Sequence, residues 1–384
     1  MVTQDGILYR VAEARDVFPV MRLYQIATSG ISKDSVFLDA KRLLEAIQSP
    51  HSPRIVGERN GEIKAVFSIL IDKADKIAKI NRLYIDPHWE DWERMLREAL
   101  PLLVSYLTAD KRAVEVIYTI SRNFSPEQEK MTWEMGFKIL GIIPNHPLMD
   151  GERLNGLTSY FVSHVLDRKR YSDFALHPLV APLYEITREQ CGLNELKISE
   201  APSFGPMSFE RLPALELIHA PQFVAHKFGI LNERKSLSIH FYPFTTPNAM
   251  ITDPAGKIEI YVKVMPGQRM ATIIGERLDI AVSPAELYRE VARILAHQNI
   301  SYIEAINDAA DVWGIECFAN AGYLPCAYFP ALKSQGERRR DYVVLARTFE
   351  RLLGGDGLPR DLHPAYLRYL TAFHKLEARG MSLR

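Results

Sequence analysis

The feature that most constrains the fold is a set of glycine and proline positions that recurs along the 384 residues at nearly constant spacing. Three pairs of identical residues are separated by 195, 197 and 186 positions: Gly61 and Gly256, Pro87 and Pro284, and Gly136 and Gly322. Such residues mark turns and helix starts, so a duplicated domain explains the pattern more simply than coincidence. The length also fits two domains of ordinary size.

Composition narrows the class of protein. Lys plus Arg and Asp plus Glu both number 47, and this zero net charge argues against a protein whose main task is to coat nucleic acid. The cysteines, Cys191, Cys317 and Cys326, show no CxxC spacing, which indicates reduced thiols and no metal site. The N-terminus lacks a signal-peptide pattern, and the densest apolar strand, 65–71, is too short to cross a bilayer. We expect a cytoplasmic protein without nucleic-acid or membrane partners; its oligomeric state stays open.

The first half alternates predicted strands and helices. Asn60-Gly61 suits a tight hairpin turn, and Asp86-Pro87 predicts a helix start, with Asp86 as the N-cap. Strands are expected at 7–14, 54–59, 62–71, 77–85, 113–120 and 157–165, and helices from 16, over 39–47, after 87 and from 125.

The second half repeats this plan. Ser283-Pro284-Ala285-Glu286 predicts a capping box with proline at the first helical position. Strands are expected at 248–252, 257–265, 269–282, 301–306 and 341–347, and helices from 283, over 311–321 and over 363–376. The expected divisions are an N-terminal domain at 1–167, a linker with a helix at 168–212, a C-terminal domain at 213–350 and a helical tail at 351–384.

This order of elements is similar to that of the GNAT acyltransferase fold. The local sequences at 82–87, 134–137 and 320–323 resemble the end of that family's fourth strand and its glycine–aromatic helix end. The resemblance covers most of 7–165 and 248–347. It implies an α/β protein of two tandem GNAT-like domains, each with a mixed, largely antiparallel sheet flanked by helices.

The resemblance also implies chemistry: transfer of an acyl group from a thioester of CoA or a carrier protein (acyl-CoA or phosphopantetheine) to an amine. In the family the thioester lies where the fourth and fifth strands separate, with its phosphates at the next helix start. The first half has His88-Trp89-Glu90-Asp91-Trp92-Glu93 there, and its carboxylates repel a diphosphate. The second half is less acidic, so we expect the C-terminal domain to be the active one. Its cofactor-binding candidates are Ile280, Val282, Ser283, Ala285, Glu286, Asn307 and Asp308. For Asn307 and Asp308 the alternative is helix capping.

Three residues are the catalytic candidates. Glu276 and Asp279 lie on the strand where the family often places its general base. Their odd separation puts them on opposite faces, so at most one faces the cleft unless Gly275 marks a bulge; the alternative is two solvated strand residues. Cys317 is a candidate acyl acceptor or else a small buried hydrophobe. At the family's usual tyrosine position stand Thr132 and Phe318, which cannot act as the acid.

Two further questions stay open from the sequence. The basic run 336–341 is either a solvated hairpin loop flanked by Glu337 and Asp341, or a clamp for phosphates or an acidic partner. The chain as a whole is either an acyltransferase, whose partner is a small-molecule amine or a carrier protein, or a non-catalytic scaffold, that is, a ligand-binding or interaction module.

Overall fold

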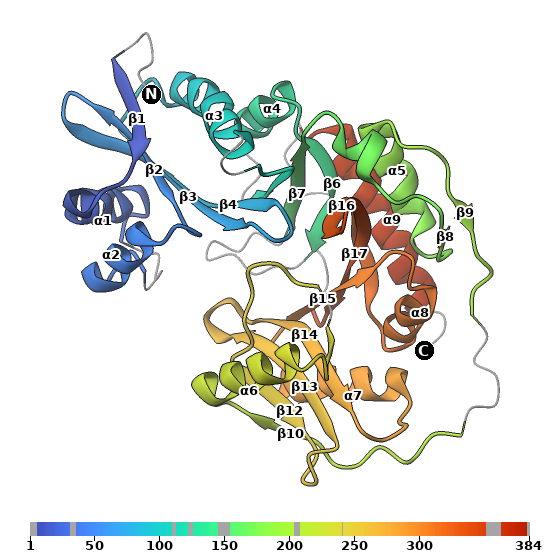
Figure 1. The fold of residues 1–384 in the computed structure, drawn as a ribbon. Helices are drawn as coiled ribbons and strands as arrows, with labels where there is room; N and C mark the ends of the chain where they lie inside the picture. The colour runs from blue at the N-terminus through green and yellow to red at the C-terminus, as the bar shows by residue number, and fades with distance from the viewer. Residues whose placement is uncertain are drawn as a thin grey trace. The chain divides into compact units, whose positions relative to one another are not determined.

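The computed structural model describes residues 6–30, 36–109, 113–121, 126–144, 154–202, 208–239, 241–350 and 362–381. The chain splits into two compact units (Figure 1): Met1–Lys138 with Thr158–Val165, and Ile139–Leu157 with Leu166–Arg384. Residues 139–157, which we expected in the N-terminal domain, therefore group with the second unit. The bounds 1–167, 168–212, 213–350 and 351–384 stay a prediction.

The first half has the expected order of strands and helices. Its strands are β1 (Ile7–Val11), β2 (Arg54–Arg59), β3 (Glu62–Asp72), β4 (Ile77–Ile85), β5 (Val116–Ser121), β6 (Lys138–Pro144) and β7 (Leu154–Phe161). Its helices are a 3-10 turn (Ala14–Asp16), α1 (Val17–Ala27), α2 (Ala40–Gln48), α3 (Trp92–Thr108) and α4 (Pro126–Glu134). The strands β1 to β4 pair antiparallel with their neighbours, whereas β4 and β5 pair parallel.

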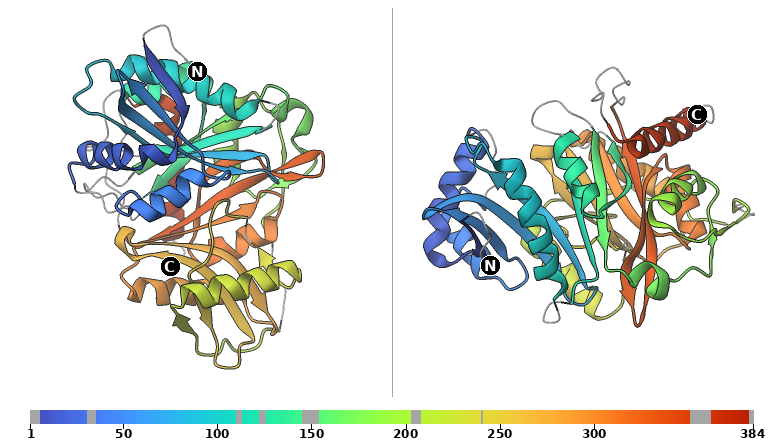
Figure 2. Two further views of the ribbon diagram at one scale, coloured as in Figure 1. Left: turned by 60° about the vertical axis from the view of Figure 1, so that its left-hand side comes forward. Right: turned by 90° about the horizontal axis from the view of Figure 1, so that it is seen from above.

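Both faces of the first unit's sheet are covered by helices. Successive side chains of β3 point to opposite faces, so Val66 packs with α1 and α2, while Phe67 packs with α3. Figure 2 shows these helices on the two sides of the strands. At the tip of the β2–β3 hairpin, Asn60 and Gly61 have φ of 52° and 80°, as the predicted tight turn requires.

The helix start predicted at Asp86-Pro87 is wrong, because α3 begins only at Trp92. A closed turn precedes it: the Asp86 carboxylate accepts from the His88 N–H at 3.0 Å, and the Asp86 carbonyl accepts from the Trp89 N–H at 3.0 Å. Lys64 Nζ lies 3.1 Å from the same carboxylate. Asp86 therefore caps a turn, and Asp91 takes the N-cap position.

The second half carries additional short elements. Its strands are β8 (Ala175–Leu176), β9 (Lys197–Ile198), β10 (Glu216–Ile218), β11 (Ser238–Ile239), β12 (Ala249–Thr252), β13 (Ile258–Met265), β14 (Met270–Leu278), β15 (Tyr302–Asp308), β16 (Leu324–Gln335) and β17 (Arg338–Thr348). Its helices are a π-helical turn (Val165–Lys169), α5 (Ala181–Cys191), α6 (Pro221–Glu233), a 3-10 turn (Pro266–Gln268), α7 (Pro284–His297), α8 (Val312–Asn320) and α9 (Pro364–Met381).

The two halves share one plan. The strand order β10-β12-β13-β14-β15 repeats β1-β2-β3-β4-β5, and β14 pairs parallel with β15 as β4 does with β5. The helices α7 and α8 follow in the same places as α3 and α4. Gly136 and Gly322 both adopt the left-handed conformation, with φ of 87° and 85°. The predicted α/β fold class is confirmed.

The predicted linker helix and the C-terminal tail pack together in the second unit. The helix α9 lies beside α5 (Figure 1), and the hydroxyls of Thr187 and Tyr369 are 2.8 Å apart. The Tyr184 ring contacts the Tyr328 ring of β16 at 5.0 Å between centroids. Both segments thus extend the core of the second unit.

The solvated hairpin, one of the two alternatives for 336–341, holds for Gly336, Glu337 and Arg338, which are exposed, but not for the residues that follow. Gly336 in the turn has a φ of 63°. Arg339 and Asp341 lie within β17 and are each only 1% exposed. The Arg339 guanidinium donates to the carbonyls of Ala331 and Leu332, at 2.6 and 2.7 Å. A buried arginine is tolerable here because carbonyl oxygens satisfy its donors.

Candidate functional site

The second unit has a cleft where β14 and β15 separate. The two strands pair only over Met270–Thr272 and Tyr302–Glu304, although they continue to Leu278 and Asp308. The cleft has a volume of about 370 Å³. Its lining comes from β14, β15, α7, α8, β17 and the β11 segment: Ser238, Phe241, Glu276, Pro284, Tyr288, Ile306, Asn307, Asp308, Asp311, Trp313, Gly314, Cys317, Phe318 and Tyr342.

Glu276 lies in this cleft and is half-buried. The Tyr288 hydroxyl donates to its carboxylate at 2.9 Å. Burial first, and the Glu276 charge second, raise the pKa of Tyr288 well above its ordinary value, so the phenol keeps its proton. The register of β13 against β14 shifts between Tyr261, opposite Gly275, and Val262, opposite Ile273. The strand is thus irregular beside Gly275, where the sequence allowed for a bulge.

Asp279, the other carboxylate candidate, lies outside the cleft. It follows the end of β14, is exposed, and forms an ion pair with Arg277. The structure therefore does not bring Glu276 and Asp279 together.

The predicted cofactor residues fall into two groups. Asn307 and Asp308 line the cleft, whereas Ile280, Val282, Ser283, Ala285 and Glu286 do not. The strand predicted to reach 282 ends at Leu278, and the Ser283 hydroxyl accepts from the Glu286 N–H at 3.4 Å as the N-cap of α7. One half of the predicted capping box is thus present at this helix start.

Asn307 and Asp308 combine a place in the cleft with capping contacts. Asn307 Nδ2 donates to Asp311 Oδ2 at 3.1 Å, and Asp311 caps α8 by accepting from the Gly314 N–H at 2.9 Å. Asp308 accepts from the Ala310 N–H at 2.9 Å. A side chain at Gly314 would place its Cβ only 2.1 Å from Asp311 Oδ2, so this glycine permits the close turn.

Cys317 is 2% exposed, at the base of the cleft. Burial, followed by the charges of Asp311, Glu316 and Glu276, raises the pKa of its thiol to about 12. The thiol is therefore protonated near neutral pH, and the thiolate is the nucleophilic form. This environment favours the small buried hydrophobe over the acyl acceptor.

Sequence reasoning missed Tyr288 as a site residue. Its ring stacks on Phe318 with centroids 4.1 Å apart and an interplanar angle of 13°. Phe318 occupies the position at which the GNAT resemblance places a tyrosine that acts as the acid. In this chain the phenol that lies against this position belongs to Tyr288, which comes from α7. No local pattern in the sequence indicated Glu276 as the partner of Tyr288.

The strand β11 was also missed. Ser238 pairs antiparallel with Glu276, and Ile239 with Gly275. One edge of β14 pairs with β13 along its whole length. The other edge pairs with β15 over Met270–Thr272, and β11 pairs with this second edge beyond the point where the pairing with β15 ends. The alternation Ser236-Leu237-Ser238-Ile239 is a weak strand signal that could have indicated it.

Within the described part of the chain, no group of three or more His, Cys, Asp or Glu side chains could hold a metal ion. None of the described helices is long and apolar enough to cross a membrane.

No protein-family model matches the sequence, and no curated protein matches it. Solved structures of acetyltransferases are similar to it in fold. The ribosomal-protein-S18-alanine N-acetyltransferase from Escherichia coli is 17% identical, with a TM-score of 0.35, over 43% of this chain and 99% of that protein. Mutant forms of the spermidine/spermine N-acetyltransferase SpeG from Vibrio cholerae are 16% identical, with a TM-score of 0.36, over 42% and 98%.

A third similar structure is RimL, a ribosomal L7/L12 α-N-protein acetyltransferase solved in complex with coenzyme A. It is 14% identical, with a TM-score of 0.36, over 42% of this chain and 97% of that protein. Each of these similarities spans about two fifths of the chain.

Proposed function

We propose that the second unit transfers an acyl group from a thioester to an amine, with Glu276 as the proton acceptor. The observation that carries the proposal is the position of this carboxylate inside the cleft where β14 and β15 separate. The GNAT-type order of elements makes this cleft the expected thioester site. Asp279, three residues on, lies outside it and serves as an internal reference.

The chemistry requires one proton to leave the amine and one to reach the sulfur. The free amine attacks the thioester carbonyl carbon, and Glu276 takes the one proton that its nitrogen loses. The C–N bond forms as the C–S bond breaks, and the thiolate leaves with the bonding electrons. Tyr288, whose hydroxyl contacts Glu276, is the donor available to the thiolate, and the proton that Glu276 took from the amine then returns to Tyr288. Holding the two reactants together supplies much of the remaining rate enhancement.

The helix start beside the cleft favours donors without a nucleotide diphosphate. Pro284 contributes no N–H there, and Glu286 adds a negative charge to the first turn of α7. A carrier protein presents only the phosphopantetheine arm, so its thioester depends less on a diphosphate site. We therefore propose a carrier-protein thioester as the preferred donor, with acyl-CoA as the alternative.

The test is turnover of a panel of acyl-carrier and acyl-CoA donors with primary amines, measured on the full chain. Glu276→Gln keeps the size of the side chain and removes the base, so kcat/KM should fall by about a hundredfold to ten-thousandfold. The matched control, Asp279→Asn, should keep the wild-type rate. Equal rates for wild type and Glu276→Gln across the pH range would exclude Glu276 as the base.

A second candidate, a non-catalytic ligand-binding module, is favoured by β11. This strand already occupies the β14 edge beside Glu276, where an extended thioester arm would otherwise pair. The candidate predicts that wild-type protein consumes no thioester from the whole panel while the cleft still binds a small molecule. Turnover by wild type, lost in Glu276→Gln, would exclude it.

A further inference from the structure

The charges that line the cleft of the second unit all have one sign. Glu276, Asp308 and Asp311 contribute carboxylates, and no Lys, Arg or His is among the described lining residues. Asp308 is compensated from outside the lining by Arg340, at 3.0 Å. For Glu276 and Asp311, the described residues provide hydrogen-bond donors but no ion pair. The cleft therefore has negative charge without an internal counter-ion.

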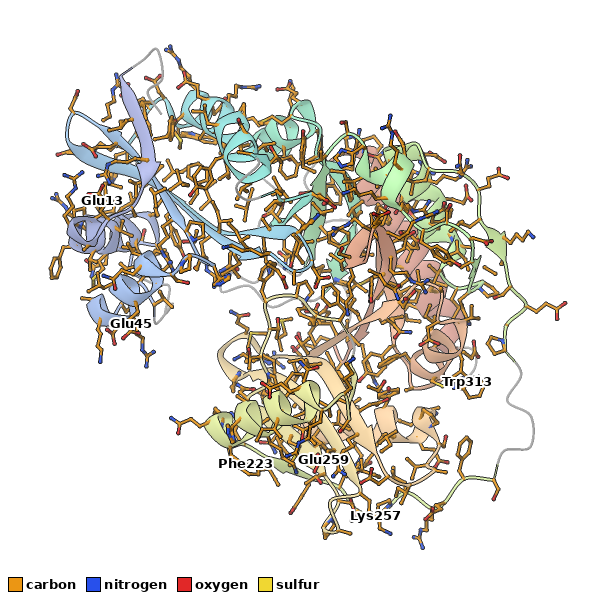
Figure 3. All side chains as sticks on the ribbon, viewed as in Figure 1. Glu13, Glu45, Phe223, Lys257, Glu259 and Trp313 are labelled. Carbon is orange, nitrogen blue, oxygen red and sulfur yellow. The ribbon has the colours of Figure 1, made fainter. Side chains whose placement is uncertain are left out.

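The same cleft is rich in aromatic rings. Five of its lining residues are aromatic: Phe241, Tyr288, Trp313, Phe318 and Tyr342. Trp313, labelled in Figure 3 at the start of α8, is 37% exposed, although large apolar side chains are usually buried. The Phe241 and Tyr342 rings contact each other at 5.4 Å between centroids. Ring faces carry partial negative charge, so they attract cations in the same way as the carboxylates.

Phe241 already forms one such contact. Lys333 Nζ lies 4.6 Å from the centroid of its ring. Lys333 is not among the described lining residues, so its ammonium is not a charge inside the cleft. The contact shows that the electrostatic environment of this ring accommodates an ammonium group.

We propose that this cleft is a binding site for an organic cation: an ammonium group on an apolar body. Glu276 and Asp311 would neutralise the charge, and the rings of Phe241, Trp313 and Tyr342 would cover the apolar part. The volume of about 370 Å³ is that of a small-molecule site. The inference concerns binding alone, so it holds whether or not acyl transfer takes place. Anions such as a diphosphate are excluded by the same charges.

Calorimetry with an isosteric pair tests the proposal on the full chain. Choline and 3,3-dimethyl-1-butanol have nearly the same shape, but only choline is charged, and its quaternary nitrogen cannot be acylated. We expect choline to bind at least about tenfold more tightly than the alcohol. Pyrophosphate should not bind. Choline affinity should also fall as salt is raised, because charge attraction is screened.

Variants locate the site. Glu276→Gln should weaken choline binding several-fold, whereas Asp279→Asn, on the same stretch of chain but outside the cleft, should not. Trp313→Leu should weaken it, and Trp313→Phe should restore most of it. Similar affinities for choline and the alcohol, pyrophosphate binding, or equal effects of Glu276→Gln and Asp279→Asn would overturn the proposal. Choline binding without any thioester turnover would support the cation site and contradict the proposed function; turnover without a preference for cations would do the reverse.

Discussion

Arg170 and Asp341 form an ion pair inside the second unit, with Arg170 Nη2 2.7 Å from Asp341 Oδ2 and side-chain exposures of 3% and 0%. The same carboxylate accepts from the Tyr328 hydroxyl at 2.5 Å and from the Ala331 N–H at 2.8 Å. Asp341 thus ties the segment after the π-helical turn to β16 and β17. A buried carboxylate with this many donors is stable only while each of them stays in place.

Asp341→Asn should lower the free energy of unfolding by about 3–5 kcal/mol, because it leaves the Arg170 guanidinium buried without its counter-ion. Urea denaturation of the full chain measures this loss. The control is Arg188→Ala, which breaks an exposed ion pair with Glu185 and should lower the free energy of unfolding far less. Similar losses for the two variants would show that the buried pair contributes no more than a surface pair.

A buried carboxylate in β13 should make stability depend on pH. Glu259 is 1% exposed and lies below α6 (Figure 3). Burial by itself raises its pKa, but hydrogen bonds from Arg277, Lys227 and Tyr261 outweigh burial and hold the pKa below its ordinary value. A depressed folded pKa stabilises the protein above the unfolded value of about 4.3, and this stabilisation is lost as the pH falls through the folded pKa.

Thermal melts between pH 7 and pH 3 test this linkage. Wild-type protein should lose stability steeply below about pH 4.3. Glu259→Gln should be less stable at pH 7 and should show a shallower acid dependence. Glu45→Gln, at an exposed position of α2, should keep the wild-type profile. An unchanged acid slope in Glu259→Gln would assign the dependence to other carboxylates.

The three cysteines should react with thiol reagents at different rates. Cys317 and Cys326 are buried, with raised thiol pKa values, whereas Cys191 at the end of α5 is partly exposed. Iodoacetamide at pH 8 should therefore label Cys191 first, because only the thiolate reacts. Peptide mass spectrometry over time separates the sites. Labelling of Cys317 as fast as Cys191 would mean that α8 opens readily or that the thiol is activated.

The pairing of β11 with β14 should compete with an extended donor. Ser238→Pro removes one backbone N–H from β11, and proline disfavours strand pairing. If the thioester arm uses the same edge of β14, this variant should bind an acyl-carrier donor more tightly than wild type. Ser238→Ala, which keeps the backbone N–H of β11, is the control. Tighter binding in neither variant would show that β11 and the donor do not share this edge.

The element order followed from local signals in the sequence. Gly61, Gly136 and Gly322 adopt left-handed backbone conformations, which glycine permits without strain, so their spacing revealed the duplicated plan before any contact was known. Ser283 and Pro284 start α7 as predicted, since a helix cap depends on a few neighbouring residues. The helix start predicted at Asp86 from the same kind of local signal is wrong, because a carboxylate caps a turn as readily as a helix.

Only the tertiary structure decided which residues form the cleft. The choice between Glu276 and Asp279 depends on an irregularity in β14 that is set by pairing with β13, and on where that strand ends. The burial of Arg339 and the placement of β11 depend on partners from other strands and loops. The sequence by itself determined the repeated elements, because turns and caps are local. The lining of the cleft was decided by strand pairing between segments far apart in the chain, whose register no local pattern specifies.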